Sequence, residues 1–157
     1  MVRRKAGKQA SVASATIAVA RTAAEIGRCH EVMQELRTHI ATREEFVERV
    51  QRQQQQGYWL AFLEADGAVR AVAGYRIMEM LFSGRTLYVD DLVTHGADRS
   101  AGFGGRLFDW LVKEARREKC AGFTLDSGVQ RFAAHRFYLT KRMEISSHHF
   151  SLDLSQS

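Results

Sequence analysis

The chain has 157 residues, of which 45% are hydrophobic and 26% charged, with two cysteines and no proline. This length is typical of one domain whose hydrophobic core is stable without disulfides or bound metal. Cys29 and Cys120 provide neither a disulfide framework nor a zinc motif. The formal net charge of +5 resides in residues 1–21, because the basic and acidic side chains of the remaining residues balance. We therefore expect a cytoplasmic protein with reduced thiols, no nucleic-acid partner and no membrane span.

Residues 1–15 are predicted to be a basic, disordered arm, and residues 16–157 a single domain. The arm carries Arg3, Arg4, Lys5 and Lys8 without an acidic residue. Polar residues interrupt its alanine-rich part, so a cleaved secretory signal is disfavoured. The β-branched stretch 16–20 predicts the first strand.

Two helices are expected next, each opened by a threonine three residues before a glutamate. Thr22 precedes Glu25, and apolar residues then recur at helical spacing to Ile40. Thr42 and Glu45 repeat the signal, and the glutamine run 53–56 is interpreted as the solvated end of the second helix.

Three strands in a meander follow. The dense apolar run 58–63 ends at Asp66-Gly67, a dipeptide that favours a tight hairpin. A second strand is expected over 69–80 and a third over 86–94, joined by Ser83-Gly84. The chain then predicts a helix over 105–119, a strand over 122–126, a helix over 130–139 and a last strand over 143–154.

A glycine-rich turn lies between the third meander strand and the next helix. A helix N-terminus exposes backbone N–H groups and the positive end of the helix dipole, which suits a phosphate or pyrophosphate. The turn is no P-loop, because Gly104-Gly105 is followed by Arg106 rather than Lys-Ser/Thr. It is no Rossmann fingerprint either, because it does not follow the first strand.

At these residues the chain resembles the GNAT superfamily of acyl-CoA-dependent N-acetyltransferases. Arg99, Gly102 and Gly104 match the motif Q/R-x-x-G-x-G/A, and residues 134–138 are similar to the A-x-x-F-Y segment of the family's penultimate helix. The resemblance implies an α/β (α+β) GNAT fold: a mixed, mostly antiparallel sheet with splayed strands 4 and 5 and helices on both faces. It also implies acetyl-CoA as co-substrate.

The resemblance further implies which residues hold the cofactor. Backbone groups of Leu92, Val93 and Thr94 would pair with the pantetheine arm, and an N–H near Val93 would face the thioester oxygen. Arg131 is a candidate for the phosphates, and Ser127 or Gln130 would substitute for the asparagine of many relatives. The amides expected to hold the pyrophosphate belong to Arg99, Ser100, Ala101, Gly102, Phe103 and Gly104.

Three residues are candidates for catalysis. Tyr138 matches the family tyrosine that protonates the departing thiolate. Asp90 and Asp91 are strand neighbours, so one should face the cleft and take the ammonium proton or anchor a cationic substrate; a bulge would leave the choice between them open. Both could instead be solvated. No metal site is predicted, since His148 and His149 lack a third ligand with convincing spacing.

The acceptor side is expected to involve the loop 37–43 together with Tyr75, Arg76, Glu79 and Tyr88. Because Glu79, Asp90 and Asp91 are acidic, a cationic small-molecule amine is favoured. A protein or peptide N-acetyltransferase and a non-catalytic acyl-CoA-binding module are the alternatives. Since many relatives dimerise through exposed strands, a homodimer is also expected.

Overall fold

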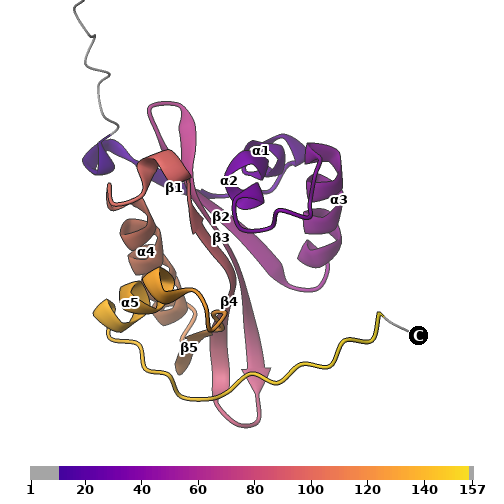
Figure 1. The fold of residues 1–157 in the computed structure, drawn as a ribbon, viewed down its shortest axis with the longest axis vertical. Helices are drawn as coiled ribbons and strands as arrows, with labels where there is room; N and C mark the ends of the chain where they lie inside the picture. Colours follow the sequence, from indigo (N-terminus) through magenta and orange to yellow (C-terminus); the bar gives the residue numbers. More distant parts are fainter. Residues whose placement is uncertain (1–10, 156–157) are drawn as a thin grey trace, which may run out of the picture. The chain divides into compact units, whose positions relative to one another are not determined.

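The computed structural model describes residues 11–155, which divide between Thr124 and Leu125 into two compact units (Figure 1). The first unit holds a sheet and four α-helices. The second contains one helix and an extended C-terminal segment. The elements are η1 (Val12–Ser14), β1 (Thr16–Val19), α1 (Ala23–Arg28), α2 (His30–Gln34), α3 (Arg43–Gln54), β2 (Tyr58–Ala65), β3 (Ala68–Met80), β4 (Gly84–Thr94), η2 (Gly96–Asp98), α4 (Phe103–Arg117), β5 (Gly122–Leu125) and α5 (Phe132–Thr140).

The sheet has the order β1-β2-β3-β4-β5 and is mixed, with β4 and β5 parallel. The first four strands pair antiparallel, as the meander pattern predicts. Asp66 (φ 52°) and Gly67 (φ 75°) both have positive φ, the geometry of the tight hairpin expected between β2 and β3. The expected fold class, a mixed and mostly antiparallel sheet with helices, is confirmed.

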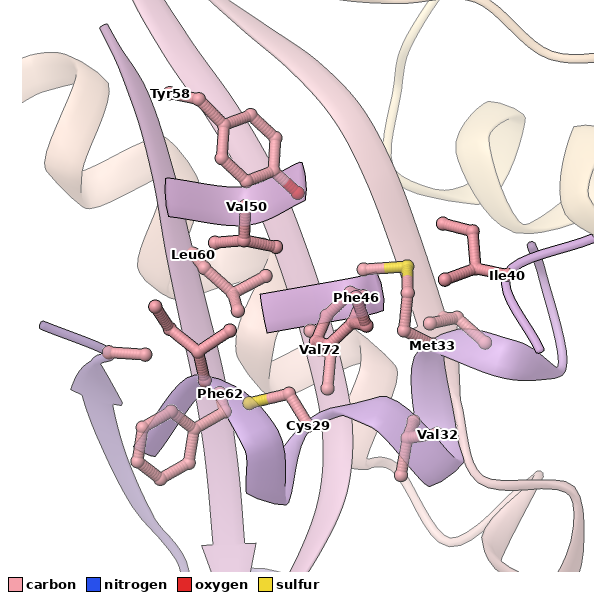
Figure 2. Close-up of a cluster of buried hydrophobic side chains, with 13 residues drawn as sticks. Cys29, Val32, Met33, Ile40, Phe46, Val50, Tyr58, Leu60, Phe62 and Val72 are labelled. Carbon is pink, nitrogen blue, oxygen red and sulfur yellow. The ribbon is translucent and has the colours of Figure 1, made fainter. Parts of the chain in front are cut away.

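Helices α1–α3 cover one face of the sheet, and α4 packs on the other (Figure 1). Figure 2 shows the core on the α1–α3 side, where Met33, Phe46 and Val50 lie against Tyr58 and Leu60 of β2. The apolar stripe of α4 supplies the buried residues Phe103, Leu107, Phe108, Leu111 and Ala115. Alternation along β2 therefore sends successive side chains into two separate cores.

The helical region before β2 differs from the sequence prediction in one respect. Thr22 and Glu25 form the expected capping box, and Thr42 accepts from the N–H of Glu45. The first helix, however, is two short helices, because the Cys29 N–H bonds to Ile26, three residues back, and so tightens the turn. Helix α2 ends at Gln34, which leaves Ile40 in a loop.

The ends of the described chain also depart from expectation. Residues 1–10 of the expected arm lie outside the described residues. Residues 11–15 carry η1, and the Arg106 side chain donates to the Val12 carbonyl. The strand expected over 143–154 is wrong: within their unit these residues make no ladder with another strand, and strand-like alternation needs a partner.

Within the described residues, no helix combines the length and the apolar character needed to cross a membrane. Cys29 and Cys120 are both free, and burial raises the pKa of the Cys29 thiol to about 12. Cys29 therefore stays protonated and packs as an apolar side chain.

Candidate functional site

A bulge in β4 places Asp90 and Asp91 on the same cavity. Gly74 of β3 pairs with Asp91 and Tyr75 pairs with Val89, so Asp90 is an extra residue without a partner of its own. Such a residue interrupts the alternation of side chains between the two faces. Both aspartates line one cavity. The regular alternation that would let only one aspartate face the cavity is interrupted by this bulge, the case in which the sequence left the choice between them open.

Asp91 is held by two partners from other elements. Arg37 Nε donates to its Oδ1 at 2.7 Å, and the Tyr58 hydroxyl donates to its Oδ2 at 2.8 Å. Tyr58 is buried, and burial together with the adjacent carboxylates raises its pKa well above the ordinary value. The phenol therefore remains a donor to Asp91 at every physiological pH.

Gly74 makes the contact between Tyr58 and Asp91 sterically possible. A Cβ at this position would lie 1.9 Å from the Tyr58 hydroxyl oxygen and 2.3 Å from the ring carbon that carries it. The Tyr58 ring therefore packs directly on the backbone of Gly74 in β3, which lets its hydroxyl reach Asp91 on β4. Position 74 must be glycine because any side chain there would collide with Tyr58, and the sequence pattern alone does not predict this requirement.

Asp90 is paired with a second arginine. Arg76 Nε donates to its two oxygens at 2.9 and 3.2 Å, and Arg37 also donates to its backbone carbonyl at 3.0 Å. Burial raises the pKa of Asp90, and the hydrogen bond from Arg76 opposes that effect. The carboxylate of Asp90 thus has one side-chain partner, Arg76, whereas that of Asp91 has two.

The cavity has a volume of about 620 Å³ and lies between the α2–α3 loop, α3, β2 and β4. This size is typical of small-ligand pockets. Its polar and charged lining comprises Arg37, His39, Arg49, Arg52, Gln53, Gln56, Tyr58, Tyr88, Asp90 and Asp91, and its apolar lining Met33, Ile40, Phe46 and Val50.

The lining agrees only in part with the acceptor side expected from the sequence. The loop residues Arg37, His39 and Ile40 line the cavity as predicted, and so does Tyr88. Tyr75 does not, because it is buried on the α4 face with its ring edge against Trp110. Arg76 does not line the cavity but forms an ion pair with Asp90, which does, and Glu79 is absent from the lining.

Sequence reasoning missed Tyr58 and the α3 contribution. Tyr58 is buried within the apolar run, but it also lines the cavity and its hydroxyl reaches Asp91, and Gln53 and Gln56 of the predicted solvated helix end line the same cavity. The signal available was the repeat of Arg49, Arg52, Gln53 and Gln56 at helical spacing on a face that also carries Phe46 and Val50.

The last part of β4 extends beyond β5. The Ala121 N–H donates to the Arg85 carbonyl, so β5 begins beside the start of β4 and is only four residues long. Leu92, Val93 and Thr94 pair with β3 on one side. Because β5 starts beside Arg85 and has only four residues, their other edge lies past the length of β5.

The glycine-rich turn forms a helix N-terminus without a side-chain cap. Ser100 (φ 72°) and Gly102 (φ 90°) have left-handed backbone, and the first hydrogen bond of α4 runs from the Arg106 N–H to the Gly102 carbonyl. Among the described residues, no acceptor is found for the N–H groups of Phe103 and Gly104. Phe103 itself is buried and anchors the turn. This is the geometry of an anion site.

Arg99 and the loop before it are tied to α2 by a single carboxylate. Glu35 accepts from Arg99 at 3.1 Å and from the Gly96 N–H at 2.8 Å. The Arg99 side chain is 66% exposed, so this ion pair adds little stability on its own. Its contribution is to orient the loop that leads into the turn, together with the Ala101 N–H bond to Asp98.

The remaining predicted site residues lie in the second unit. Ser127 Oγ is buried, and no hydrogen-bond partner is found for it in the described part of the chain. Arg131 is the N-cap of α5, and burial raises the pKa of Tyr138 while Arg131 opposes that shift. No cluster of three potential metal ligands occurs within residues 11–155.

The comparisons with known proteins identify the family. The model of the Acetyltransferase (GNAT) family matches residues 20–143. The chain belongs to this family. It is 35% identical over 118 residues to the uncharacterized N-acetyltransferase YhdJ of Bacillus subtilis (strain 168), an alignment that covers 74% of this chain and 82% of YhdJ. The resemblance noted in the sequence is thus confirmed, and the protein is a GNAT acyltransferase.

Solved structures agree with the fold at low sequence identity. The ribosomal-protein-alanine N-acetyltransferase from Brucella melitensis biovar Abortus 2308 matches with a TM-score of 0.78 and 13% identity, covering 90% of this chain and all of the other. AAC(6')-Iy, in complex with the bisubstrate analogue CoA-S-monomethyl-acetylneamine, matches with a TM-score of 0.75 and 11% identity, covering 88% and 97%. At these identities the GNAT fold is what is shared.

Proposed function

We propose that this GNAT protein transfers an acetyl group from acetyl-CoA to a primary amine of a small molecule in one direct step. One observation carries the proposal: β4 bears two aspartates on a ligand-sized cavity and, a few residues later, leads into a helix N-terminus where the N–H groups of Phe103 and Gly104 have no acceptor among residues 11–155. The reaction needs a site for the amine acceptor and a site for the phosphates of the cofactor, and β4 with the turn that follows it would supply both.

Residues of the first unit fit the cofactor. The N–H groups of Phe103 and Gly104 would bind the pyrophosphate, and the edge of Leu92–Thr94 that does not pair with β3 would pair with the pantetheine amides. A Cβ on Gly104 would lie 2.6 Å from Thr94 Oγ1, so this position admits backbone alone. The cofactor, when bound, supplies the activated acetyl group.

The acceptor must present a neutral nitrogen, so a proton has to leave its ammonium group. We assign that proton to Asp90, directly or through one water molecule, because burial raises the pKa of Asp90 toward that of a working base. Asp91, fixed by Arg37 and Tyr58, is assigned a positioning role beside it.

The transfer forms an N–C bond and breaks the C–S bond. The nitrogen loses a second proton as it becomes an amide, and the departing thiolate gains one, so a group that protonates the thiolate can recover its proton from the nitrogen. We assign the protonation of the thiolate to the Tyr138 hydroxyl, following the family motif. Burial raises the pKa of Tyr138, so the phenol holds its proton at neutral pH until a strong base such as a thiolate removes it.

The test is a thiol-release screen with acetyl-CoA across polyamines, amino sugars, amino acids and lysine peptides, combined with calorimetry of acetyl-CoA binding. We expect acetyl-CoA to bind and at least one small amine to release thiol well above the rate of hydrolysis. Absence of acetyl-CoA binding would refute the proposed function. Turnover confined to lysine peptides would favour a protein or peptide acceptor instead.

A further inference from the structure

The cavity carries more positive charge than its two aspartates suggest. Each aspartate is already neutralised by an arginine, Asp91 by Arg37 and Asp90 by Arg76. Two further arginines, Arg49 and Arg52, line the cavity from α3. The charge of the lining is thus cationic overall, the opposite of what the acidic residues in the sequence alone predict.

Arg52 has unused binding capacity. No ion pair joins it to an acidic side chain in the described part of the chain, although Glu48 is four residues earlier on the same helix. Arg49 pairs with Glu45 at 2.8 Å, but both side chains are about 40% exposed. An exposed pair of this kind contributes little and exchanges readily for a better partner.

Arg49 and Arg52 are three residues apart on α3, so their side chains emerge on neighbouring turns. The amides of Gln53 and Gln56 lie on the same wall. Guanidinium groups match the planar geometry of a carboxylate or the oxygens of a phosphate, and amide N–H groups complete such a site. The opposite wall is β4 with Asp90 and Asp91.

From this arrangement, and resting on the proposed function, we infer that the acceptor is an amine that also carries an anionic group. The anion, a carboxylate or a phosphate, binds Arg52 and Arg49 at the α3 wall, and the amine lies toward Asp90. A polyamine or another purely cationic amine meets repulsion from the arginine pair and is a poor acceptor.

The experiment compares matched acceptors that differ only in the anionic group. Alanine against alaninamide tests a carboxylate, and glucosamine 6-phosphate against glucosamine tests a phosphate. We expect the anionic member of at least one pair to have a kcat/KM at least tenfold higher, and the pair that shows it identifies the anion. An equal or greater kcat/KM for the neutral members of both pairs would overturn the inference while leaving the proposed function intact.

Substitution of the arginine gives the second arm. Arg52→Gln should raise KM for the anionic acceptor by about tenfold to a hundredfold, the loss of one charge-assisted contact, without changing the KM of the neutral partner or of acetyl-CoA. Arg116→Gln removes the same charge from an exposed position on α4 and serves as the matched control. A selective rise in the KM of acetyl-CoA would instead assign Arg52 to the cofactor and refute the inference.

A binding measurement separates this inference from the proposed function. Calorimetry with glucosamine 6-phosphate and with alanine requires no turnover, and Arg52→Gln should weaken binding of the preferred ligand about tenfold or more. If neither compound binds the wild-type protein, the inference fails. If one binds and Arg52→Gln releases it, yet no amine is acetylated and acetyl-CoA does not bind, the proposed function fails while the anion site stands.

Discussion

At the scale of single residues, the site depends on charges that are paired across long stretches of chain. Arg37 and Asp91 are separated by 54 positions and Arg76 and Asp90 by 14, and each pair joins two different elements. The Asp91 side chain is only 11% exposed, so its charge depends on protein partners rather than on water. Removing one partner therefore costs more than the pair contributes as a whole.

This asymmetry predicts the outcome of a double-mutant cycle. Arg37→Leu should lower the free energy of unfolding by about 2 kcal/mol, because Asp91 keeps its charge without its cation. Adding Asp91→Asn should restore part of that loss, with a coupling energy of about 1–2 kcal/mol in urea unfolding. Strictly additive losses would show that Arg37 and Asp91 do not depend on one another.

The assignment of Asp90 as the proton acceptor predicts a pH dependence. Because burial raises the pKa of Asp90, its carboxylate takes up a proton at a higher pH than an ordinary aspartate, and activity should fall as the pH drops through that raised value. The acidic limb of kcat should disappear in Asp90→Asn, with a large loss of rate at neutral pH.

Two acceptors of different amine pKa separate Asp90 from the substrate. The limb due to Asp90 stays in place when the acceptor changes, whereas a limb due to the amine moves with it. If every limb follows the amine and Asp90→Asn retains wild-type kcat, Asp90 is not the base.

Tyr138 gives a prediction at the alkaline end. Its pKa is raised above the ordinary value of 10.0, so it stays protonated at higher pH than a free phenol and should cause no loss of rate between pH 8 and 9.5. Tyr138→Phe should lower kcat by about a hundredfold, the usual contribution of a general acid, and leave the affinity for acetyl-CoA unchanged in calorimetry. Unchanged kcat would remove Tyr138 from the mechanism.

At the scale of elements, two glycines let backbone and side chains approach closely, and they allow separate tests of stability and binding. Gly74→Ala places a methyl group 1.9 Å from the Tyr58 hydroxyl oxygen, which displaces the ring from Asp91. We expect a loss of about 2–4 kcal/mol in urea unfolding. Gly27→Ala is a suitable control, because its Cβ would lie 3.3 Å from a flexible arginine side chain.

Gly104→Ala should affect the cofactor more than the fold. The new Cβ would lie 2.6 Å from Thr94 Oγ1, and removing that hydroxyl in Gly104→Ala/Thr94→Ala leaves a distance of 3.9 Å to the Thr94 Cβ. The double variant should therefore regain stability in thermal unfolding. It should not regain acetyl-CoA affinity in calorimetry, because the methyl group still covers the amides of the turn. Recovery of both properties would show that the turn does not hold the cofactor.

The elements show which features local sequence can predict. The capping box at Thr22, the Asp66-Gly67 hairpin and the position of the glycine-rich turn before α4 each depend on residues within a few positions, and all three are present in the structure as predicted. The bulge at Asp90 depends on the register of β3 against β4. Because alternation in β4 alone fits either register, the shared orientation of the two aspartates could not be predicted.

The whole molecule shows how far composition predicts binding. The acidic residues of β4 suggested a cationic acceptor, but their arginine partners come from β3 and the α2–α3 loop, and only the tertiary structure brings them together. The cavity likewise combines four separate segments. Local motifs predicted the glycine-rich turn before α4, whereas the charge of the cavity lining depends on the complete fold.

The excess charge of the chain leads to a prediction for the full-length protein. Deleting residues 1–10 removes Arg3, Arg4, Lys5 and Lys8 and lowers the formal net charge from +5 to +1. Any retention of a DNA duplex at low salt should then be lost, because affinity for a polyanion scales with the cations that displace its counterions. Acetyl-CoA affinity should be unchanged, since we assign the binding of its pyrophosphate to amides of the turn before α4.

Fluorescence anisotropy over a salt series measures the first quantity and calorimetry the second. Replacing the same four basic residues by glutamine in the full-length chain is the matched control, because it removes charge without shortening the protein. If the truncated protein still binds DNA with a steep salt dependence, a basic face on residues 11–157 binds it, despite the balance of charges over residues 22–157. That result would contradict the assignment of DNA retention to the first ten residues.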